Sequence, residues 1–277
     1  MKKKKSRKLK YIFIGLLGFM SFLSVSQAAT YTNYNNIVIK EDEYSNLINL
    51  GFSSDEIYYM DLNTFNNNKN LNAILLTKNI KYYKSNTFNN ESTEITANEY
   101  FLSKENTTRG TVNTEYKNMV STISLNGSKY RYKVSLSWKQ MPKIRSYDII
   151  GIGFSDNIKI DSSVYFNYYY CNSSGTCTTK SEYFDKKSIS TGGSAVFKFP
   201  REAVSMSATL FYDVAKKNND TINNITMCGD YSHATSNVSI NNISDYTINI
   251  NGLVLGSSIY NKYDSIPCAK TTLNVNW

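Results

Sequence analysis

The sequence predicts a mainly β protein, an antiparallel β-sandwich preceded by a small helical module. From residue 111 onward, short runs of alternating apolar and polar residues recur with turn residues between them. Residues 41–70 instead place apolar residues at helical spacing. Strict alternation of strands and helices, which would indicate a doubly wound α/β fold, is absent.

The first 28 residues have the composition of a secretory signal peptide. MKKKKSRKLK carries seven Lys or Arg and no acid, YIFIGLLGFMSFL is a short apolar run, and SVSQAAT supplies small residues for cleavage. We predict cleavage near Ala28. The alternative is an uncleaved membrane anchor, but a bilayer span needs about 20 apolar residues, more than this run provides.

The basic charge of the chain comes largely from this leader. The sequence has 31 basic and 22 acidic residues, a formal net charge of +9. Seven basic residues precede Ala29, so cleavage leaves 24 basic against 22 acidic residues, a net charge of about +2. This balance argues against a nucleic-acid partner. Later segments are too short to span a bilayer, so we expect the mature chain to be secreted or held at the cell surface.

Residues 29–72 are predicted to form a small helical module. In EDEYSNLINLG the apolar residues recur at helical spacing, and a glycine follows where the helix would end. Ser53 precedes Glu56 by three residues, the pattern of a capping box that opens a second short helix. Asp61 and Asn63 are both candidates to cap a third helical turn.

A resemblance covers about residues 40–84. The segment YSNLINLGFSSDEIYYMDLNTFNNNKNLNA, followed by TKNIKYYK, resembles the opening of uncharacterised secreted proteins of low-GC Gram-positive bacteria. Its Leu-Gly-Phe, Glu-Ile and Met core is also similar to the short helical repeats of ubiquitin-associated-type folds. The resemblance implies an exported bacterial protein and carries no catalytic residues.

Residues 73–110 are predicted as a strand, AILLTKNIKYYK, and a polar connector, and residues 111–277 as the β-sandwich domain. The clearest hairpin signal is Asn126-Gly127 between two alternating runs. On the second run, apolar residues from Tyr130 to Trp138 share one face and basic or hydroxyl residues share the other. This pattern predicts one buried face and one solvated face. Further strands are expected at YDIIGIGF, SVYFNYYYC, CTTKSEYF, SAVFKF, VSMSATLFYDV, NVSI, DYTININGLVL and TLNVNW.

Four cysteines in an exported chain are expected to form disulfide bonds. Cys171 and Cys177 flank the turn NSSGT and would face each other across a hairpin. This favours a Cys171–Cys177 bond and leaves Cys228 to pair with Cys268, although the other two connectivities stay open.

The segment CGDYSHATS contains His233, the single histidine of the chain. Adjacent residues of a strand face opposite ways, so Ser232 and His233 cannot act as a catalytic pair in an extended segment. The sequence lacks a Gly-x-Ser-x-Gly motif, and paired cysteines leave no free thiol. We therefore expect this segment to be a turn, with His233 a polar residue at a strand start that nearby backbone satisfies.

Neither a metal nor a cofactor is predicted. One histidine, without His-Glu-x-x-His or Cys-x-x-Cys, leaves no transition-metal ligand set, although a loop such as KNNDTINN could bind calcium without a readable motif. A glycosidase needs only two carboxylates across a cleft. The candidates are Asp148, Glu182, Asp185 and Asp213.

Tyrosine-rich strands and a basic strand face favour a binding protein over an enzyme. The candidate binding residues are Lys129, Arg131, Lys133, Tyr168, Tyr169 and Tyr170. The basic row suits an anionic wall polymer, and tyrosine rings suit sugar faces and protein interfaces.

The sequence thus predicts an exported, non-catalytic protein of the bacterial surface or medium that recognises an envelope glycan, an anionic polymer or a surface protein. The alternatives are a secreted glycan hydrolase with a carboxylate pair and a membrane-active protein that inserts β-hairpins such as MVSTISL with VSLSW.

Overall fold

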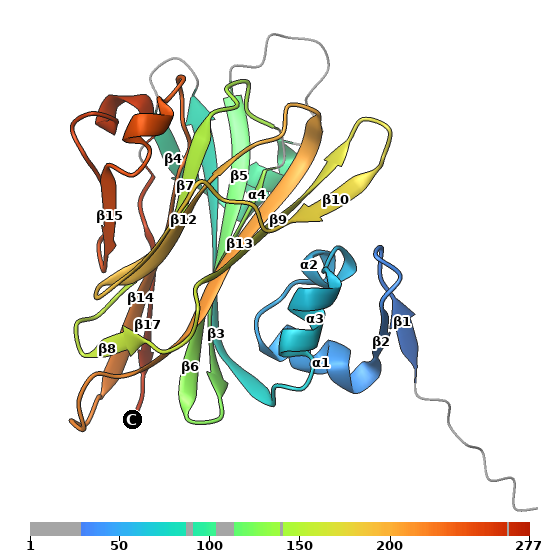
Figure 1. Cartoon of the computed structure of the whole chain (residues 1–277), viewed down its shortest axis with the longest axis vertical. Coiled ribbons are helices and arrows are strands. Elements are labelled where there is room, and N and C mark those ends of the chain that lie inside the picture. Colours follow the sequence, from blue (N-terminus) through green and yellow to red (C-terminus); the bar gives the residue numbers. More distant parts are fainter. Residues whose placement is uncertain (1–28, 87–90, 104–113, 139–140, 265) are drawn as a thin grey trace, which may run out of the picture.

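The computed structural model describes residues 29–86, 91–103, 114–138, 141–264 and 266–277. The predicted signal peptide and part of the polar connector lie outside these residues. Two antiparallel sheets pack face to face, with helices beside one sheet and the β15 segment beside the other (Figure 1). The predicted fold class, an antiparallel β-sandwich with a small helical N-terminal module, is confirmed.

The two sheets differ in size, and every strand pair in them is antiparallel. The eight-stranded large sheet runs in the order β10 (Cys177–Lys180), β9 (Tyr165–Asn172), β13 (Ala203–Lys216), β6 (Lys129–Trp138), β5 (Thr114–Asn126), β3 (Ala73–Asn86) and β4 (Glu91–Ile95), with β8 (Ile158–Ile160) also on β13. The five-stranded small sheet runs in the order β11 (Asp185–Ile189), β12 (Gly192–Lys198), β7 (Tyr147–Phe154), β14 (Asn224–Ser232) and β17 (Ala269–Asn274).

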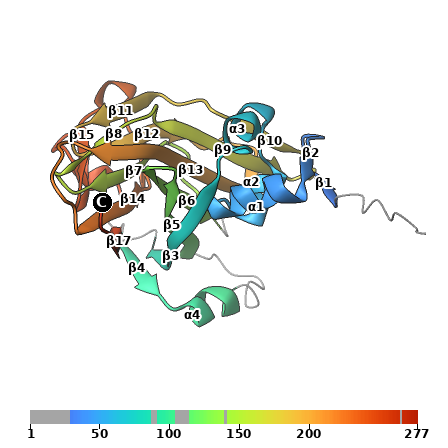
Figure 2. The same ribbon diagram turned by 90° about the horizontal axis from the view of Figure 1, so that it is seen from below.

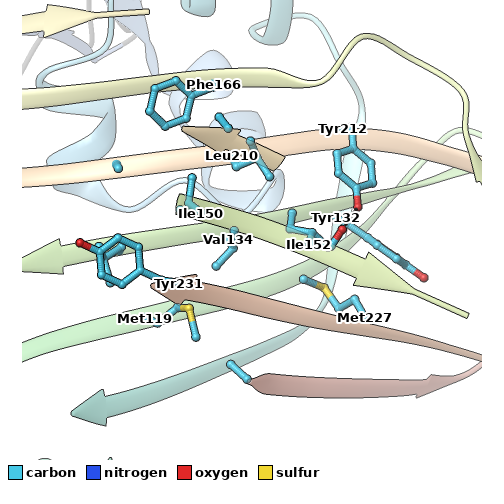
Figure 3. Close-up of a cluster of buried hydrophobic side chains, with 14 of the residues drawn as sticks. Met119, Tyr132, Val134, Ile150, Ile152, Phe166, Leu210, Tyr212, Met227 and Tyr231 are labelled. Carbon is cyan, nitrogen blue, oxygen red and sulfur yellow. Dashed lines mark hydrogen bonds between the residues drawn. The ribbon is translucent and has the colours of Figure 1, made fainter. Parts of the chain in front are cut away.

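The core lies between the two sheets. The predicted Asn126-Gly127 hairpin joins β5 to β6, and Gly127 has the positive φ of 64° that such a turn requires. Alternate residues of β6 and β7 point inward, so that Val134, Ile150 and Ile152 pack together with Tyr212 and Tyr231 (Figure 3). The two-residue period therefore identified the buried face of these strands correctly.

The segment from Ala73 belongs to the sandwich and does not connect a separate domain to it. β3 pairs along its length with β5, and β4 extends the sheet beyond β3. A short helix, α4 (Ala97–Leu102), follows β4 at this edge of the large sheet (Figure 2).

The helical module contains β1 (Thr30–Thr32), β2 (Val38–Lys40), α1 (Glu41–Asn49), α2 (Ser54–Tyr58) and α3 (Leu62–Asn68). The Ser53–Glu56 capping box forms as predicted, with the Ser53 N–H donating to Glu56 Oε2 at 2.7 Å and the Glu56 N–H donating to Ser53 Oγ at 3.2 Å. Asp61, rather than Asn63, caps α3. The apolar side of the module packs on the outer face of the large sheet, where Phe52 meets Phe211 edge to face.

A C-terminal cover, residues 234–263, packs on the outer face of the small sheet. It contains two 3₁₀ turns, η1 (Ile240–Asn242) and η2 (Tyr260–Lys262), and the hairpin β15 (Tyr246–Asn249) and β16 (Gly252–Leu255). The sequence expectation was wrong at two points here. NVSI forms no strand, and DYTININGLVL is a tight hairpin that turns at residues 250–251, after which Gly252 begins the second strand with a φ of 108°.

Both preferred disulfides are present, Cys171–Cys177 across the β9–β10 hairpin and Cys228–Cys268 between β14 and the residue before β17. Together they use all four cysteines, which fits an oxidising compartment.

Candidate functional site

A groove of about 540 Å³ lies where β4, the end of β14 and the β15–β16 hairpin meet. Its polar lining comes from Glu91, Asp230, Ser232, Tyr260, Asn261 and Asp264. Tyr260 is 70% exposed, whereas Asp230 and Asp264 are buried at the bottom of the groove. The groove therefore combines an exposed aromatic ring with carboxylate, amide and hydroxyl groups.

Glycines bring the hairpin close enough to form one wall of this groove. A Cβ on Gly153 of β7 would collide with the backbone of Asn249 in β15, and a Cβ on Gly252 would collide with the Asp230 carboxylate. Both positions thus require glycine, which allows the hairpin to lie directly on the small sheet.

Asp230 fixes the hairpin to β14 through backbone hydrogen bonds. Its Oδ1 accepts from the N–H of Tyr231 and its Oδ2 from the N–H of Leu253, each at 2.7 Å. Burial is the main cause that raises the pKa of Asp230, to about 7, against the lowering effect of these two hydrogen bonds.

Asp264 is held by three donors beneath the groove. Its Oδ1 accepts from the backbone N–H of His233 at 2.7 Å, while its Oδ2 accepts from Ser92 Oγ at 2.8 Å and from the Lys117 ammonium. Burial raises the pKa of Asp264, but Lys117, His233 and these hydrogen bonds outweigh it, so the pKa lies below its usual value.

Lys117 reaches Asp264 from the inward face of β5. Its side chain is fully buried, and its Nζ lies 4.8 Å from the Trp138 ring centroid and 5.1 Å from that of Tyr231. The two-residue period places Lys117 on the same face of β5 as Met119 and Ile123, which belong to the core.

His233 forms a buried dyad with Asp148 of β7. The ring Nδ1 lies 3.0 Å from both Asp148 carboxylate oxygens, and the same carboxylate accepts from the Tyr231 hydroxyl and from the Ala234 N–H. Trp138 Nε1 donates to the Tyr231 hydroxyl at 3.1 Å. Burial lowers the pKa of His233, but the Asp148 and Asp264 carboxylates raise it above its usual value overall.

The prediction of a turn around His233 was wrong. β14 extends from Asn224 to Ser232, so most of this segment is the end of a strand of the small sheet, and His233 directly follows that end rather than standing at a strand start. The histidine is satisfied by a side chain from a neighbouring strand rather than by local backbone. In the described part of the chain no serine or threonine hydroxyl hydrogen-bonds the ring, and His233 is only 3% exposed. The dyad therefore lacks both a nucleophile and access to the groove.

The predicted basic row does not form an exposed surface. Lys133 lies beneath the helical module, where its Nζ donates to Glu56 Oε2 at 2.9 Å and to the Gly51 carbonyl at 3.0 Å. Arg131 is also buried and pairs with Asp213 at 2.7 Å. Only Lys129 of the three is exposed, and it pairs with Asp161 at 2.6 Å. The expectation of a solvated face was wrong because the module covers it.

The three tyrosines of β9 do not form an exposed strip either. Tyr168 and Tyr170 point into the core, where Tyr168 packs near Phe197. Tyr169 points the other way and stacks on Tyr59 of the helical module, with ring centroids 4.4 Å apart.

The four carboxylates predicted as glycosidase candidates do not converge. Asp148 is sealed in the dyad, Asp213 pairs with Arg131, and Glu182 is a solvent-exposed partner of Lys180. Asp185 lies on the edge strand β11.

The groove residues were not found from the sequence because they come from distant segments. Glu91, Asp230 and Tyr260 lie in three different elements. The available signals were the inward-facing Lys117 and the glycines of YDIIGIGF, which indicate close backbone approach.

Across residues 29–277, leaving out the gaps given above, no three His, Cys, Asp or Glu side chains are placed to hold a metal ion. Over the same residues, no helix has the length and apolarity needed to cross a membrane.

Comparisons with known proteins identify no family. No family model matches the chain, and no curated protein matches it. The collagen-binding domain of the Erysipelothrix rhusiopathiae surface protein RspB is 12% identical, with a TM-score of 0.29 over 57% of this chain and 66% of that one. The pilus backbone RrgB of Streptococcus pneumoniae is 8% identical, with a TM-score of 0.29 over 72% of this chain and 48% of that one. The KRT10-binding region domain of the pneumococcal protein PsrP is 10% identical, with a TM-score of 0.23 over 57% of this chain and 88% of that one. Likeness at this level assigns neither family nor function.

Proposed function

We propose that this chain is an exported, non-catalytic binding protein of the bacterial surface or medium whose groove takes a neutral, hydroxyl-rich glycan of a cell envelope. The observation that carries the proposal is the exposed ring of Tyr260 beside Asn261 at the rim of a groove lined with carboxylates. An aromatic ring offers a flat apolar face to a sugar, while the Asn261 amide and the Ser232 hydroxyl, which also line the groove, can hydrogen-bond its hydroxyls.

The charge of the groove disfavours an anionic polymer as the ligand. Glu91, Asp230 and Asp264 all contribute carboxyl groups to the lining. Two of the three basic residues predicted to meet such a polymer are buried in ion pairs. The described residues that line the groove include no Lys or Arg, so a polyanion would meet carboxyl groups rather than cations there.

The hydrogen bonding of the groove disfavours hydrolysis. Both oxygens of Asp230 accept backbone N–H groups, and both oxygens of Asp264 are already engaged by His233, Ser92 and Lys117. A general acid or nucleophile must present a carboxyl oxygen to the substrate. These two carboxyls instead hold the walls of the groove together.

The arrangement of β5 and β6 also disfavours hairpin insertion into a membrane. These strands lie in the interior of the large sheet, between β3 and β13. Their release would break the sheet on both sides and expose the core that Val134 and Leu136 help to form.

The proposal is tested by calorimetric titration of the oxidised protein with soluble oligosaccharides of N-acetylated amino sugars. Tyr260→Ala is expected to weaken binding about tenfold, equivalent to ~1.4 kcal/mol. Tyr183→Ala is the matched control, because Tyr183 is also exposed but lies outside the groove. Equal binding by Tyr260→Ala and the unchanged protein would reject the groove as the glycan site.

A further inference from the structure

We infer that Lys117 and Asp264 become joined by an amide bond between Nζ and Cγ, which forms within the folded chain and needs no other protein. Lys117 lies on β5 of the large sheet, and Asp264 lies shortly before β17 of the small sheet. Their side chains are 0% and 1% exposed, and the ammonium is in contact with the carboxylate.

The surroundings of Lys117 leave its ammonium in direct contact with one carboxylate and with few other polar groups. In the described part of the chain, Asp264 is the single oxygen acceptor of the Lys117 ammonium, and the rings of Trp138 and Tyr231 lie close to it. A buried ammonium with so few acceptors has lost its hydration without full replacement. Transfer of its proton to Asp264 gives a neutral amine beside a neutral carboxylic acid, the two groups that condense to an amide.

A second buried lysine in the same chain provides the contrast. Lys133 donates to the Gly51 carbonyl, the Ser135 hydroxyl and the Glu56 carboxylate. Three oxygen acceptors replace the hydration of its ammonium. The difference in acceptors singles out Lys117 from the buried lysines described.

The Asp264 carboxyl is also polarised for attack. Its Oδ1 accepts the His233 backbone N–H at 2.7 Å, and its Oδ2 accepts the Ser92 hydroxyl at 2.8 Å. When the lone pair of Nζ adds to Cγ, negative charge develops on a carboxyl oxygen, and fixed donors at this position stabilise it.

The reaction balances within the pair. The new C–N bond forms as one C–O bond of Asp264 breaks, and the departing oxygen leaves as water with the hydroxyl proton of the acid and one proton of the amine. Nothing is oxidised or reduced. Asp264 lines the groove, which gives the water a route out.

The crosslink would tie together residues 147 positions apart. It would lie close to the Cys228–Cys268 disulfide but, unlike the disulfide, would survive a reducing agent. After reduction, the chain would thus keep one covalent link between β5 of the large sheet and the segment that precedes β17.

Intact mass spectrometry of the purified protein, fully reduced and with its N-terminus mapped, tests the inference directly. We expect a mass lower than that of the sequence by one water molecule, and a protease digest containing a branched peptide that joins Lys117 to Asp264. A mass equal to that of the sequence would overturn the inference. Loss of water without the branched peptide would also overturn it, because an aspartyl succinimide loses water too.

Two lysine variants complete the test. Lys117→Arg should have the full mass of its sequence, because a guanidinium does not condense in this way. Lys133→Arg should still lose one water, because Lys133 takes no part. Loss of water in Lys117→Arg would contradict the assignment, and the mass of the unchanged protein decides the question even if this variant folds poorly.

Discussion

At the bottom of the groove, Asp230 has a pKa raised by burial to about 7 while its two oxygens hold the backbone of Tyr231 and Leu253. The folded protein therefore keeps this proton to a higher pH than the unfolded chain does. The contribution of Asp230 to stability is fully present below the usual carboxyl pKa and is lost as the pH rises through about 7.

From the raised pKa of Asp230 we predict the behaviour of the variant Asp230→Asn, whose amide mimics the protonated carboxyl. The unchanged protein should lose on the order of a few kcal/mol of unfolding free energy from this group between about pH 4 and about pH 8, and the variant should lose much less. Urea unfolding over this pH range measures the difference. Asp220→Asn, at an exposed position, is the control and should leave the pH dependence unchanged. Parallel pH profiles for Asp230→Asn and the unchanged protein would show that Asp230 does not carry the shift.

Individual residues also show which features of the structure could be predicted from the sequence. Trp138 and Ile152 were placed in the core correctly, because burial on one face of a strand leaves a two-residue period. The partner of His233 was not predictable, because Asp148 lies 85 residues earlier and only sheet pairing brings the two strands together. Local pattern identifies which face a residue points to, but not which distant group it meets.

At the scale of elements, the helical module is fixed to the large sheet by a buried ion pair. Lys133 of β6 and Glu56 of α2 are both buried, and Glu56 also accepts from Ser135 and Thr209. Burial raises the pKa of Glu56, but Lys133 and these hydrogen bonds bring it below its usual value. The sequence of the outer face of β6 is basic and therefore resembles a solvated face. In the folded chain the helical module covers it, and Lys133 is paired there with Glu56.

Removal of one partner should loosen the module. Lys133→Met leaves the Glu56 carboxylate buried without its cation, so we expect a loss of about 3–5 kcal/mol of unfolding free energy. Lys129→Met on the same strand is the matched control and should change stability little, because Lys129 is exposed. Denaturant unfolding measures both variants, and the double variant Lys133→Met, Glu56→Gln should recover part of the loss. Equal effects at positions 129 and 133 would contradict this role of the ion pair.

The C-terminal hairpin shows a second limit at this scale. DYTININGLVL alternates like one strand, but a turn at residues 250–251 divides it into β15 and β16. The glycines of YDIIGIGF are the feature of the sequence that indicates this hairpin. The hairpin backbone passes so close to β7 that β7 needs residues without a Cβ there.

For the whole molecule, the sandwich carries a cover on each outer face, and the groove forms where the C-terminal cover meets the sandwich edge. The fold class and both disulfides followed from local patterns and spacing. The groove did not, because it exists only once strands from opposite ends of the chain are assembled. Its lining replaces the predicted basic row and tyrosine strip as the candidate binding surface.

The measurement that tests the glycan proposal most directly is co-sedimentation of the oxidised protein with purified Gram-positive cell walls, before and after removal of their anionic polymers. We predict binding that persists from about 0.1 M to about 1 M salt, because hydrogen bonds and stacking are screened far less than exposed charge pairs. Binding should survive removal of the anionic polymers and weaken in Tyr260→Ala. Binding that disappears with salt or with the anionic polymers, or no binding at all, would contradict a neutral glycan as the ligand of this groove.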